Sequence, residues 1–419
     1  MTISGPCCGC ASRGLFLTLV LVALLLAIPS AHAQTFTILY SFLGPPDGGG
    51  PNGVIRDAEG NLYGTTYWGG VSYHGAAFKL APDGKETILY SFLGGYGWGP
   101  DWPLTQDAQG TLYGTTIHGG FYGNGAVFKL DKKGNETVLY SFKGHSDGLW
   151  PSGVIVDEMG NLYGTTPWGG GGTGCGGTGC GTVFKLDTSG RKTVLYAFAD
   201  GTDGGLPYSG LMRDKAGNLY GTTSLGGDLS CDYGYGCGTV FMLDSAGHEK
   251  TLYGFAGGTD GSQPYAGVIR DDAGNFYGTT AEGGDSSCNR GLGCGTVFRL
   301  AANGNETVLH SFTGTGGDGA YPYAGVVRDP KGNLYGTTSG GGDPNCSYGQ
   351  GNCGTVFMVN PAGKETVLHS FAGNPDGAYP SGLIRDASGN LYGSAAAAGT
   401  SNCRARYFGS CGTVFKLTP

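Results

Sequence analysis

Short hydrophobic blocks recur along the chain from residue 35 onward, and each block is bounded by Gly, Asp, Asn or Pro. Four blocks follow one another in fixed order: Gly-Val-Ile-Arg-Asp, Asn-Leu-Tyr-Gly-Thr-Thr, Gly-Thr-Val-Phe-Lys-Leu and Thr-Val-Leu-Tyr-Ser-Phe. Each is about six residues long and rich in β-branched and aromatic residues, which is typical of strands. We name the four predicted strands a, b, c and d in this order.

The four blocks return seven times. Block a stands at Gly53–Asp57 and again from 153, 210, 267, 325 and 382, with a degenerate copy at Pro103–Asp107. Block b begins at 61, 111, 161, 218, 275, 333 and 390. Block c ends at 80, 130, 186, 243, 300, 359 and 417, and block d ends at 42, 92, 142, 198, 255, 312 and 371. Repeats of this length indicate a repeat architecture.

Seven units of four short strands predict an all-β fold, a seven-bladed β-propeller with four antiparallel strands per blade. An open solenoid is the alternative, but it would need distinct capping repeats, and none is visible. The first copy of block d, Thr37–Phe42, precedes every other block, and the last unit ends on block c, Gly412–Leu417. We therefore expect the N-terminal strand to complete the last blade and close the ring, which removes two exposed strand edges.

The connections between blocks fall into two classes. The a–b turns, such as Asp57–Asn61, and the c–d turns, such as Ala81–Lys85, are short and rich in Gly, Asp and Asn. The d–a and b–c connections are longer and more variable. In an up-and-down blade the two longer sets share one face of the disc, which is where we expect a working surface.

Composition narrows the class of protein. The 419 residues include 87 Gly, which disfavours helix, and only 13% are charged. Aromatic residues make up 12%, enough for a packed core. The formal net charge of −8 argues against a nucleic-acid partner, which needs a basic surface.

The first 33 residues differ from the rest. Arg13 is followed by the apolar run Leu15–Ile28 and then by Ala31–Ala33, the pattern of a secretory signal peptide. We expect cleavage after Ala33, loss of Cys7, Cys8 and Cys10 with the peptide, and a mature single domain over residues 34–419. Since no second apolar stretch follows, we expect an exported protein, periplasmic or extracellular, without a membrane anchor.

Ten cysteines remain, paired within the b–c loops of units three to seven. An even number in an exported chain favours disulfides. Zinc is the alternative, but each pair would need two further ligands, and the spacings exceed the usual C-x₂-C. The predicted pairs are Cys175–Cys180, Cys231–Cys237, Cys288–Cys294, Cys346–Cys353 and Cys403–Cys411.

All five tryptophans lie in the long connections of units one to three, hence on one predicted face. Exposed aromatic rings with polar neighbours can stack on sugar rings or hold apolar groups. The alternative is that these rings fill gaps between glycine-rich blades. The candidate binding residues are Trp68, Trp98, Trp102, His118, Trp150 and Trp168, with Tyr67, Tyr73 and Tyr122 in the same region.

Other polar residues give weaker signals. Repeated aspartates before Gly in the d–a loops could hold Ca²⁺ near the ring axis, but Asx-type turns are favoured; Asp228, Asp285 and Asp343 are interpreted alike. His310 and His369 replace the Tyr of block d and are interpreted as packing variants. No nucleophile elbow, zinc-protease or Walker motif is present, so we expect no catalytic residue, metal or cofactor. The d–a aspartates are Asp47, Asp147, Asp203, Asp260, Asp318 and Asp376.

The combined pattern, G-V-I-R-D-x-x-G-N-L-Y-G-T-T with G-T-V-F-K-L and E-T-V-L-Y-S-F, resembles the GloVer tandem-repeat family of exported bacterial proteins over Thr35–Leu417. Its D-x-x-G-N-L-Y-G-T core is similar to blades of two-component-regulator and NHL propellers. The resemblance implies a secreted, surface or periplasmic protein and supplies no catalytic residues.

These observations favour an exported, non-enzymatic propeller that binds carbohydrate or another extracellular partner through its long-loop face. A hydrolase or lyase with a site at the axial mouth is the alternative, although the blades depart from the repeat through Trp and Cys rather than through titratable clusters. A structural or adhesive surface protein is the third hypothesis.

Overall fold

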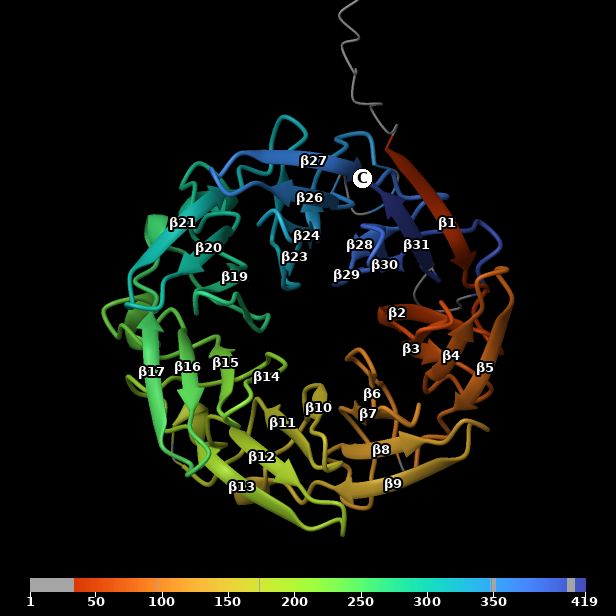
Figure 1. Cartoon of the computed structure of the whole chain (residues 1–419), viewed down its shortest axis with the longest axis horizontal. Helices are drawn as coiled ribbons and strands as arrows, with labels where there is room; N and C mark the ends of the chain where they lie inside the picture. The colour runs from red at the N-terminus through yellow and green to blue at the C-terminus, as the bar shows by residue number, and fades with distance from the viewer. Residues whose placement is uncertain (1–33, 96, 173, 347, 349–351, 405–410) are drawn as a thin grey trace, which may run out of the picture. The chain divides into compact units, whose positions relative to one another are not determined.

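The computed structural model describes residues 34–419 apart from 96, 173, 347, 349–351 and 405–410, so the predicted signal peptide lies outside the described residues. Residues Gln34–Pro419 form one compact unit. Within this unit seven antiparallel four-stranded blades surround a central axis, as predicted (Figure 1). Strand a is innermost and strand d outermost in each blade.

The first four blades follow the order of the chain. Blade 1 contains β2 (Gly48–Arg56), β3 (Leu62–Gly69), β4 (Ala76–Leu80) and β5 (Glu86–Ser91). Blade 2 contains β6 (Thr105–Gln106), β7 (Leu112–Thr116), β8 (Ala126–Leu130) and β9 (Glu136–Ser141). Blade 3 contains β10 (Val154–Val156), β11 (Leu162–Thr166), β12 (Thr182–Leu186) and β13 (Lys192–Ala197). Blade 4 contains β14 (Met212–Arg213), β15 (Leu219–Thr223), β16 (Thr239–Leu243) and β17 (Glu249–Gly254).

The last three blades follow the same plan. Blade 5 contains β18 (Ile269–Arg270), β19 (Phe276–Thr280), β20 (Thr296–Leu300) and β21 (Glu306–Ser311). Blade 6 contains β23 (Val327–Arg328), β24 (Leu334–Thr338), β26 (Thr355–Val359) and β27 (Glu365–Ser370). Blade 7 contains β29 (Ile384–Arg385), β30 (Leu391–Ala397), β31 (Thr413–Thr418) and β1 (Thr35–Ser41).

A few short elements lie in the connections. β22 (Gly319–Ala320) pairs with β25 (Gly340–Gly341), and β28 (Ala378–Pro380) pairs with β30. The described connections also contain five 3₁₀ turns, which the sequence did not predict: η1 (His145–Asp147), η2 (Cys175–Gly177), η3 (Asp232–Gly234), η4 (Gly258–Asp260) and η5 (Asn289–Gly291). Among the described residues, no helix is long and apolar enough to cross a bilayer.

The N-terminal strand closes the ring, as predicted. β1 pairs antiparallel with β31, with Thr35 opposite Thr418 and Ser41 opposite Thr413. It begins two residues earlier than the predicted strand and ends at Ser41, and Phe42 N–H still donates to the Gly412 carbonyl (3.1 Å). Blade 7 thus takes its outer strand from the start of the domain and its other strands from the end.

Most inner strands are shorter than block a predicts. Strand a pairs with strand b alone, so only two or three residues have a ladder partner in blades 2 to 7. The Asp that ends block a belongs instead to the a–b turn. In blade 1 the Asp57 carboxylate accepts hydrogen bonds from the Asn61 backbone (2.7 Å), the Asn61 amide (2.7 Å) and the Tyr63 hydroxyl (3.0 Å). Asp, Asn and Tyr of the repeat therefore form one capping network.

The core consists of matched phenylalanines at the seams between blades. Phe42, at the end of β1, meets Phe78 of β4 edge to face, with ring centroids 5.1 Å apart, and both rings are fully buried. The same contact recurs at all seven seams with centroid distances of 5.0 to 5.3 Å. A Cβ on Gly64 would lie 2.6 Å from the Phe78 ring, so the Gly of block b is required by this close approach. The repeated sequence therefore encodes seven near-identical interfaces.

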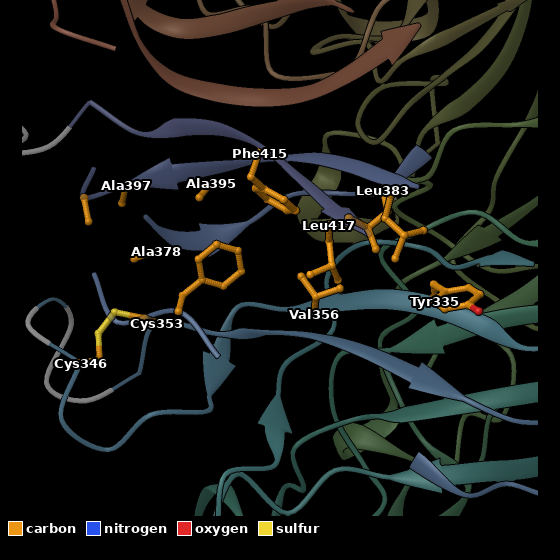
Figure 2. Close-up of a cluster of buried hydrophobic side chains, with 13 residues drawn as sticks. Tyr335, Cys346, Cys353, Val356, Ala378, Leu383, Ala395, Ala397, Phe415 and Leu417 are labelled. Atoms are coloured by element: carbon orange, nitrogen blue, oxygen red, sulfur yellow. A yellow bond between two sulfur atoms is a disulfide. The ribbon is translucent and has the colours of Figure 1, made fainter. Parts of the chain in front are cut away.

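Figure 2 shows the seam between blades 6 and 7. Val356 of β26 packs with Phe415 and Leu417 of β31, and the Cys346–Cys353 disulfide lies at the edge of this cluster. These side chains are buried, so the hydrophobic core continues from blade to blade.

Candidate functional site

The d–a and b–c connections meet on one face, which we call the loop face. In each blade a d–a residue pairs with a b–c residue in a short ladder above the sheet, for example Trp98 with His118 and Leu149 with Trp168. In blade 1 the pair is Gly49 with Trp68. A Cβ on Gly49 would lie 2.2 Å from the Trp68 ring, so this indole lies flat on the glycine.

A ring of seven residues with positive φ surrounds the axis on the loop face, each directly before a proline. Glycine occupies this position in blades 1 and 2, but larger residues occupy it in the other five. Positive φ costs an L-residue about 1–2 kcal/mol, and such strain gathers at functional sites. The seven residues are Gly50, Gly99, Trp150, Leu206, Gln263, Tyr321 and Tyr379, and the five larger ones have φ between 54° and 58°.

A continuous row of aromatic rings, the aromatic row, crosses blades 1 to 3 on this face. Trp98 stacks on His118 with centroids 4.2 Å apart. His118 meets the edge of Trp150 (6.1 Å), and Trp150 meets Trp168 (6.4 Å). His74 extends the row against Trp98 (5.8 Å). The fold therefore brings together four of the six predicted binding residues in direct contact.

The predicted aromatic residues differ in exposure. Trp98 and Trp150 are 36% and 41% exposed, large fractions for indoles, whereas Trp68 is only 8% exposed and serves packing. Trp102 and Trp168 are half-buried, while Tyr73 and Tyr122 are exposed. Some of the predicted aromatic residues therefore pack in the interior, and others offer exposed rings on which a ligand could stack.

Asp101 is the residue that the sequence interpretation missed. It follows the loop proline, where other blades carry Asn, Ser or Tyr, so its departure from the repeat was the available signal. It lines a hollow of about 230 Å³ with Trp102, His118 and Trp150. It also lines a second hollow of about 410 Å³ with Tyr67. The carboxyl thus lies between the two hollows, next to the aromatic row.

Three titratable groups of the site, Asp101, Tyr67 and His118, have shifted pKa values. Desolvation raises the pKa of Asp101 to about 6, because protein surrounds much of the carboxyl, although the residue as a whole is exposed to solvent. Desolvation also raises the pKa of Tyr67, with Asp101 as a second cause, and lowers the pKa of His118. Among the described residues that line the two hollows, Asp101 is the one carboxylate, and no Lys or Arg is present. The described lining therefore offers one negatively charged acceptor between aromatic walls.

A row of tyrosines continues around the axis in blades 4 to 6. Tyr208, which also lines the smaller hollow, lies 5.5 Å from Tyr265, and Tyr265 lies 5.4 Å from Tyr323. Desolvation and the neighbouring tyrosines raise the pKa of Tyr265 to about 12. The Tyr265 hydroxyl donates to Gln263 (3.1 Å), which donates to Glu282 (3.1 Å). These side chains are fixed by their neighbours.

All five predicted disulfides are present, with Cα–Cα distances of 5.3 to 6.0 Å. Each lies in a b–c loop of the loop face. Structural disulfides indicate an exported protein in an oxidising compartment. Cys175 and Cys180 approach Asp200 as three potential metal ligands, but their sulfurs are bonded to each other.

Removing one disulfide should destabilise the fold moderately. A Cys231→Ser, Cys237→Ser double variant is expected to lose about 2 kcal/mol of unfolding free energy, since the bridge closes a short loop. Urea denaturation of the variant beside the parent protein checks this value. A loss near zero would show that the η3 loop is ordered without its bridge.

The repeated aspartates stabilise turns, which is the interpretation that the sequence favoured. Asp147 accepts hydrogen bonds from the Lys143 backbone (2.7 Å) and the Tyr140 hydroxyl (2.8 Å), at the outer edge of the ring rather than near its axis. Asp228, Asp285 and Asp343 each accept a backbone N–H two residues later. His369 replaces Tyr as the partner of Asp376 (3.0 Å).

A family model described as the Gloeobacter/Verrucomicrobia repeat matches residues 28–234 and 231–419. No curated protein matches the chain. Among solved structures, the chain is similar to the extracellular domain of a hybrid two-component system from B. thetaiotaomicron, with 14% identity and a TM-score of 0.54. That match covers 92% of this chain and 41% of the other, so the chain spans less than half of that protein.

Two further solved structures are similar to the chain at low identity. A fungal alcohol oxidase of the AA5 family, solved with copper, is 14% identical with a TM-score of 0.56, covering 92% of this chain and 76% of that one. A gluconolactonase from Xanthomonas campestris is 13% identical with a TM-score of 0.45, covering 92% and 89%. At these identities the two-component system domain and the alcohol oxidase show the fold alone. The TM-score of the gluconolactonase is too low to carry an argument.

Proposed function

The chain belongs to the Gloeobacter/Verrucomicrobia repeat family, and we propose that this member is an exported, non-enzymatic propeller that binds neutral carbohydrate on its loop face. The observation that carries the proposal is the position of Asp101 between two hollows, beside the exposed indoles of Trp98 and Trp150. It acts in the periplasm or outside the cell.

The chemistry of the site fits a sugar. The C–H faces of a sugar ring stack on indoles, and its hydroxyls donate to a carboxylate. The smaller hollow, at about 230 Å³, is below the size of sites for drug-sized ligands and suits a single ring. Because the lining holds a carboxylate and no Lys or Arg among the described residues, uronic and sulfated glycans would meet unpaired negative charge.

The same inventory favours binding over hydrolysis. Glycoside hydrolysis ordinarily needs two carboxyl groups across the scissile bond. The described lining supplies only Asp101. One carboxylate beside aromatic platforms can orient a sugar but lacks the partner for acid–base or nucleophilic work.

Trp150→Gly should weaken glycan binding strongly without harming the fold. Glycine occupies this position in blades 1 and 2, so the backbone accepts it and loses the strain of φ 58°. Titration of intrinsic tryptophan fluorescence with neutral and acidic polysaccharides should give a saturable shift for a neutral class. We expect affinity at least about tenfold weaker in Trp150→Gly and in Asp101→Asn.

Gln263→Gly is the matched control, because Gln263 occupies the same position in blade 5, away from the aromatic row. It should bind as the parent protein does. Equal binding by Trp150→Gly, or no response to any neutral glycan, would refute the proposal.

A further inference from the structure

The seams between blades repeat one polar arrangement at the outer edge of the ring. At six of the seven seams an aromatic residue of strand d is followed by an aspartate in the d–a loop, and a residue at the start of the next strand d faces both; the d–a loop between blades 1 and 2 has no such aspartate. At the seam between blades 4 and 5, the Tyr253 hydroxyl donates to Asp260 (2.7 Å), and Glu306 is the facing residue. Tyrosine occupies the aromatic position in five of the seven seams.

The seam between blades 5 and 6 differs by one residue. His310 of β21 replaces the tyrosine, opposite Asp318 and Glu365 of β27. One ligand atom from each of the three side chains lies within 4.8 Å of the other two. His310 Nε2 and Asp318 Oδ1 are 3.5 Å apart. Two ligands of one zinc ion, each about 2.0–2.2 Å from it, lie about this far apart in a tetrahedral site.

Two buried polar atoms of this trio make no ordinary hydrogen bond among the described residues. His310 Nε2 is buried and makes no hydrogen bond beyond its long 3.5 Å approach to Asp318. Glu365 Oε1 is buried without a partner, as are the equivalent oxygens of Glu86 and Glu306, so the imidazole is what distinguishes this seam. Buried polar atoms rarely lack a hydrogen bond, and a bound ion is one recognised explanation. By contrast, His369 at the next seam makes a 3.0 Å contact with Asp376, and its facing residue is Phe36, which stacks on the imidazole.

The carboxylate of Asp318 is already oriented by its surroundings. It accepts hydrogen bonds from the backbone and hydroxyl of Thr313 (2.7 and 2.8 Å) and from the Gly319 backbone (2.7 Å). Such outer contacts hold a metal ligand in place and sustain its affinity. Asp318 and His310 are 17% and 19% exposed, which leaves room for one water molecule as a further ligand.

We propose that His310, Asp318 and Glu365 form a zinc site that joins blade 5 to blade 6. One imidazole nitrogen and two carboxylate oxygens form a ligand set that Zn²⁺ accepts, and the fourth position falls to water. The site lies at the outer seam, separate from the aromatic row, and its role is to fasten two blades. It does not depend on the proposed glycan binding.

Zinc binding should depend on His310. Untagged protein, stripped with EDTA and kept free of reductant so that its disulfides persist, is titrated with ZnCl₂ by calorimetry. We expect one equivalent bound per chain, with a rise in melting temperature. His310→Tyr restores the residue found at five other seams, so the variant should fold normally and bind Zn²⁺ at least tenfold more weakly.

Two variants make the assignment specific. His369→Tyr removes the other seam histidine, which lacks a facing glutamate, and should leave the single equivalent unchanged. Tyr253→His builds the same trio with Asp260 and Glu306 and should add a second equivalent. Undiminished binding by His310→Tyr, equal loss in His369→Tyr, or no saturable zinc binding by the parent protein would overturn the proposal.

Discussion

Raising the pH from about 5 to about 8.5 is expected to destabilise this propeller, although most proteins tolerate that range. The cause is the facing glutamate at the seams. Desolvation, with the nearby loop aspartate as a further cause, raises the pKa of Glu86 to about 7, of Glu249 to about 7 and of Glu306 to about 8. At the Glu306 seam the neighbouring groups are Asp260 and Tyr253.

The sign follows from linkage. A carboxyl whose pKa is raised in the folded state stabilises the fold when it is protonated. Its contribution to the unfolding free energy is complete below pH 4.5, the ordinary pKa of glutamate, and is lost as the pH rises through 7 to 8. The three side chains are half-buried, so solvent screens the effect, and we allow about 1 kcal/mol for each. Together they should lower the unfolding free energy by about 3 kcal/mol.

Acid acts in the opposite direction on the a–b turns. Hydrogen bonds from the turn asparagines lower the pKa of Asp157, Asp214 and Asp329, against an opposing effect of desolvation. Their stabilisation is present above the ordinary value of 3.8 and is lost below it. Stability should therefore peak between about pH 4.5 and pH 6.

Urea denaturation across this pH range, in EDTA, measures the effect. Glu306→Gln should reduce the alkaline loss by about 1 kcal/mol. Glu306→Lys should remove the alkaline loss at that seam and replace it with a stabilising ion pair. Lys192 occupies the same position in blade 3 and pairs with Asp147 at 3.0 Å. A flat profile between about pH 5 and pH 8.5 would show that these seams are solvated well enough to ionise freely.

The fold was predictable because its information is local and repeated. Each block marks a strand by its own pattern, and the displaced strand at the N-terminus predicted ring closure, which the pairing of β1 with β31 confirms. The disulfides were equally local, since each pair lies within one loop. The extent of strand a was not predictable from its block, because the block's Asp forms the a–b turn instead of extending the ladder.

The site was only partly predictable, because its parts come from different units. The sequence placed the tryptophans on one face but did not show that Trp68 is covered while Trp150 is exposed, since this depends on Gly49 opposite the first. Likewise, His310 was interpreted as a packing variant. Only the ring brings Glu365, from the next unit, to the same seam.

Removing β1 is expected to abolish folding of the whole domain, not only of blade 7. Without residues 34–42, β31 keeps β30 but loses its outer partner, and the absence of Phe42 leaves a cavity against Phe78, so the ring opens at a seam that otherwise matches the other six. The truncated chain should lose its cooperative melting transition, as followed by near-ultraviolet circular dichroism. A synthetic peptide of residues 34–43, added in trans, should restore the transition.

Single substitutions test the same closure with less disruption. Phe42→Ala and Phe255→Ala remove equivalent rings at the closing seam and at an ordinary seam, each from a contact of 5.1 Å. In a closed ring of equal seams, each should cost about 3–5 kcal/mol and keep one transition. A much smaller cost for Phe42→Ala would mean that the closing seam contributes little and that the blades behave as an open array, whose stability is a sum of neighbour contacts. Equal costs would show that the closing seam contributes as much as an ordinary seam, as expected of a ring without a terminal repeat.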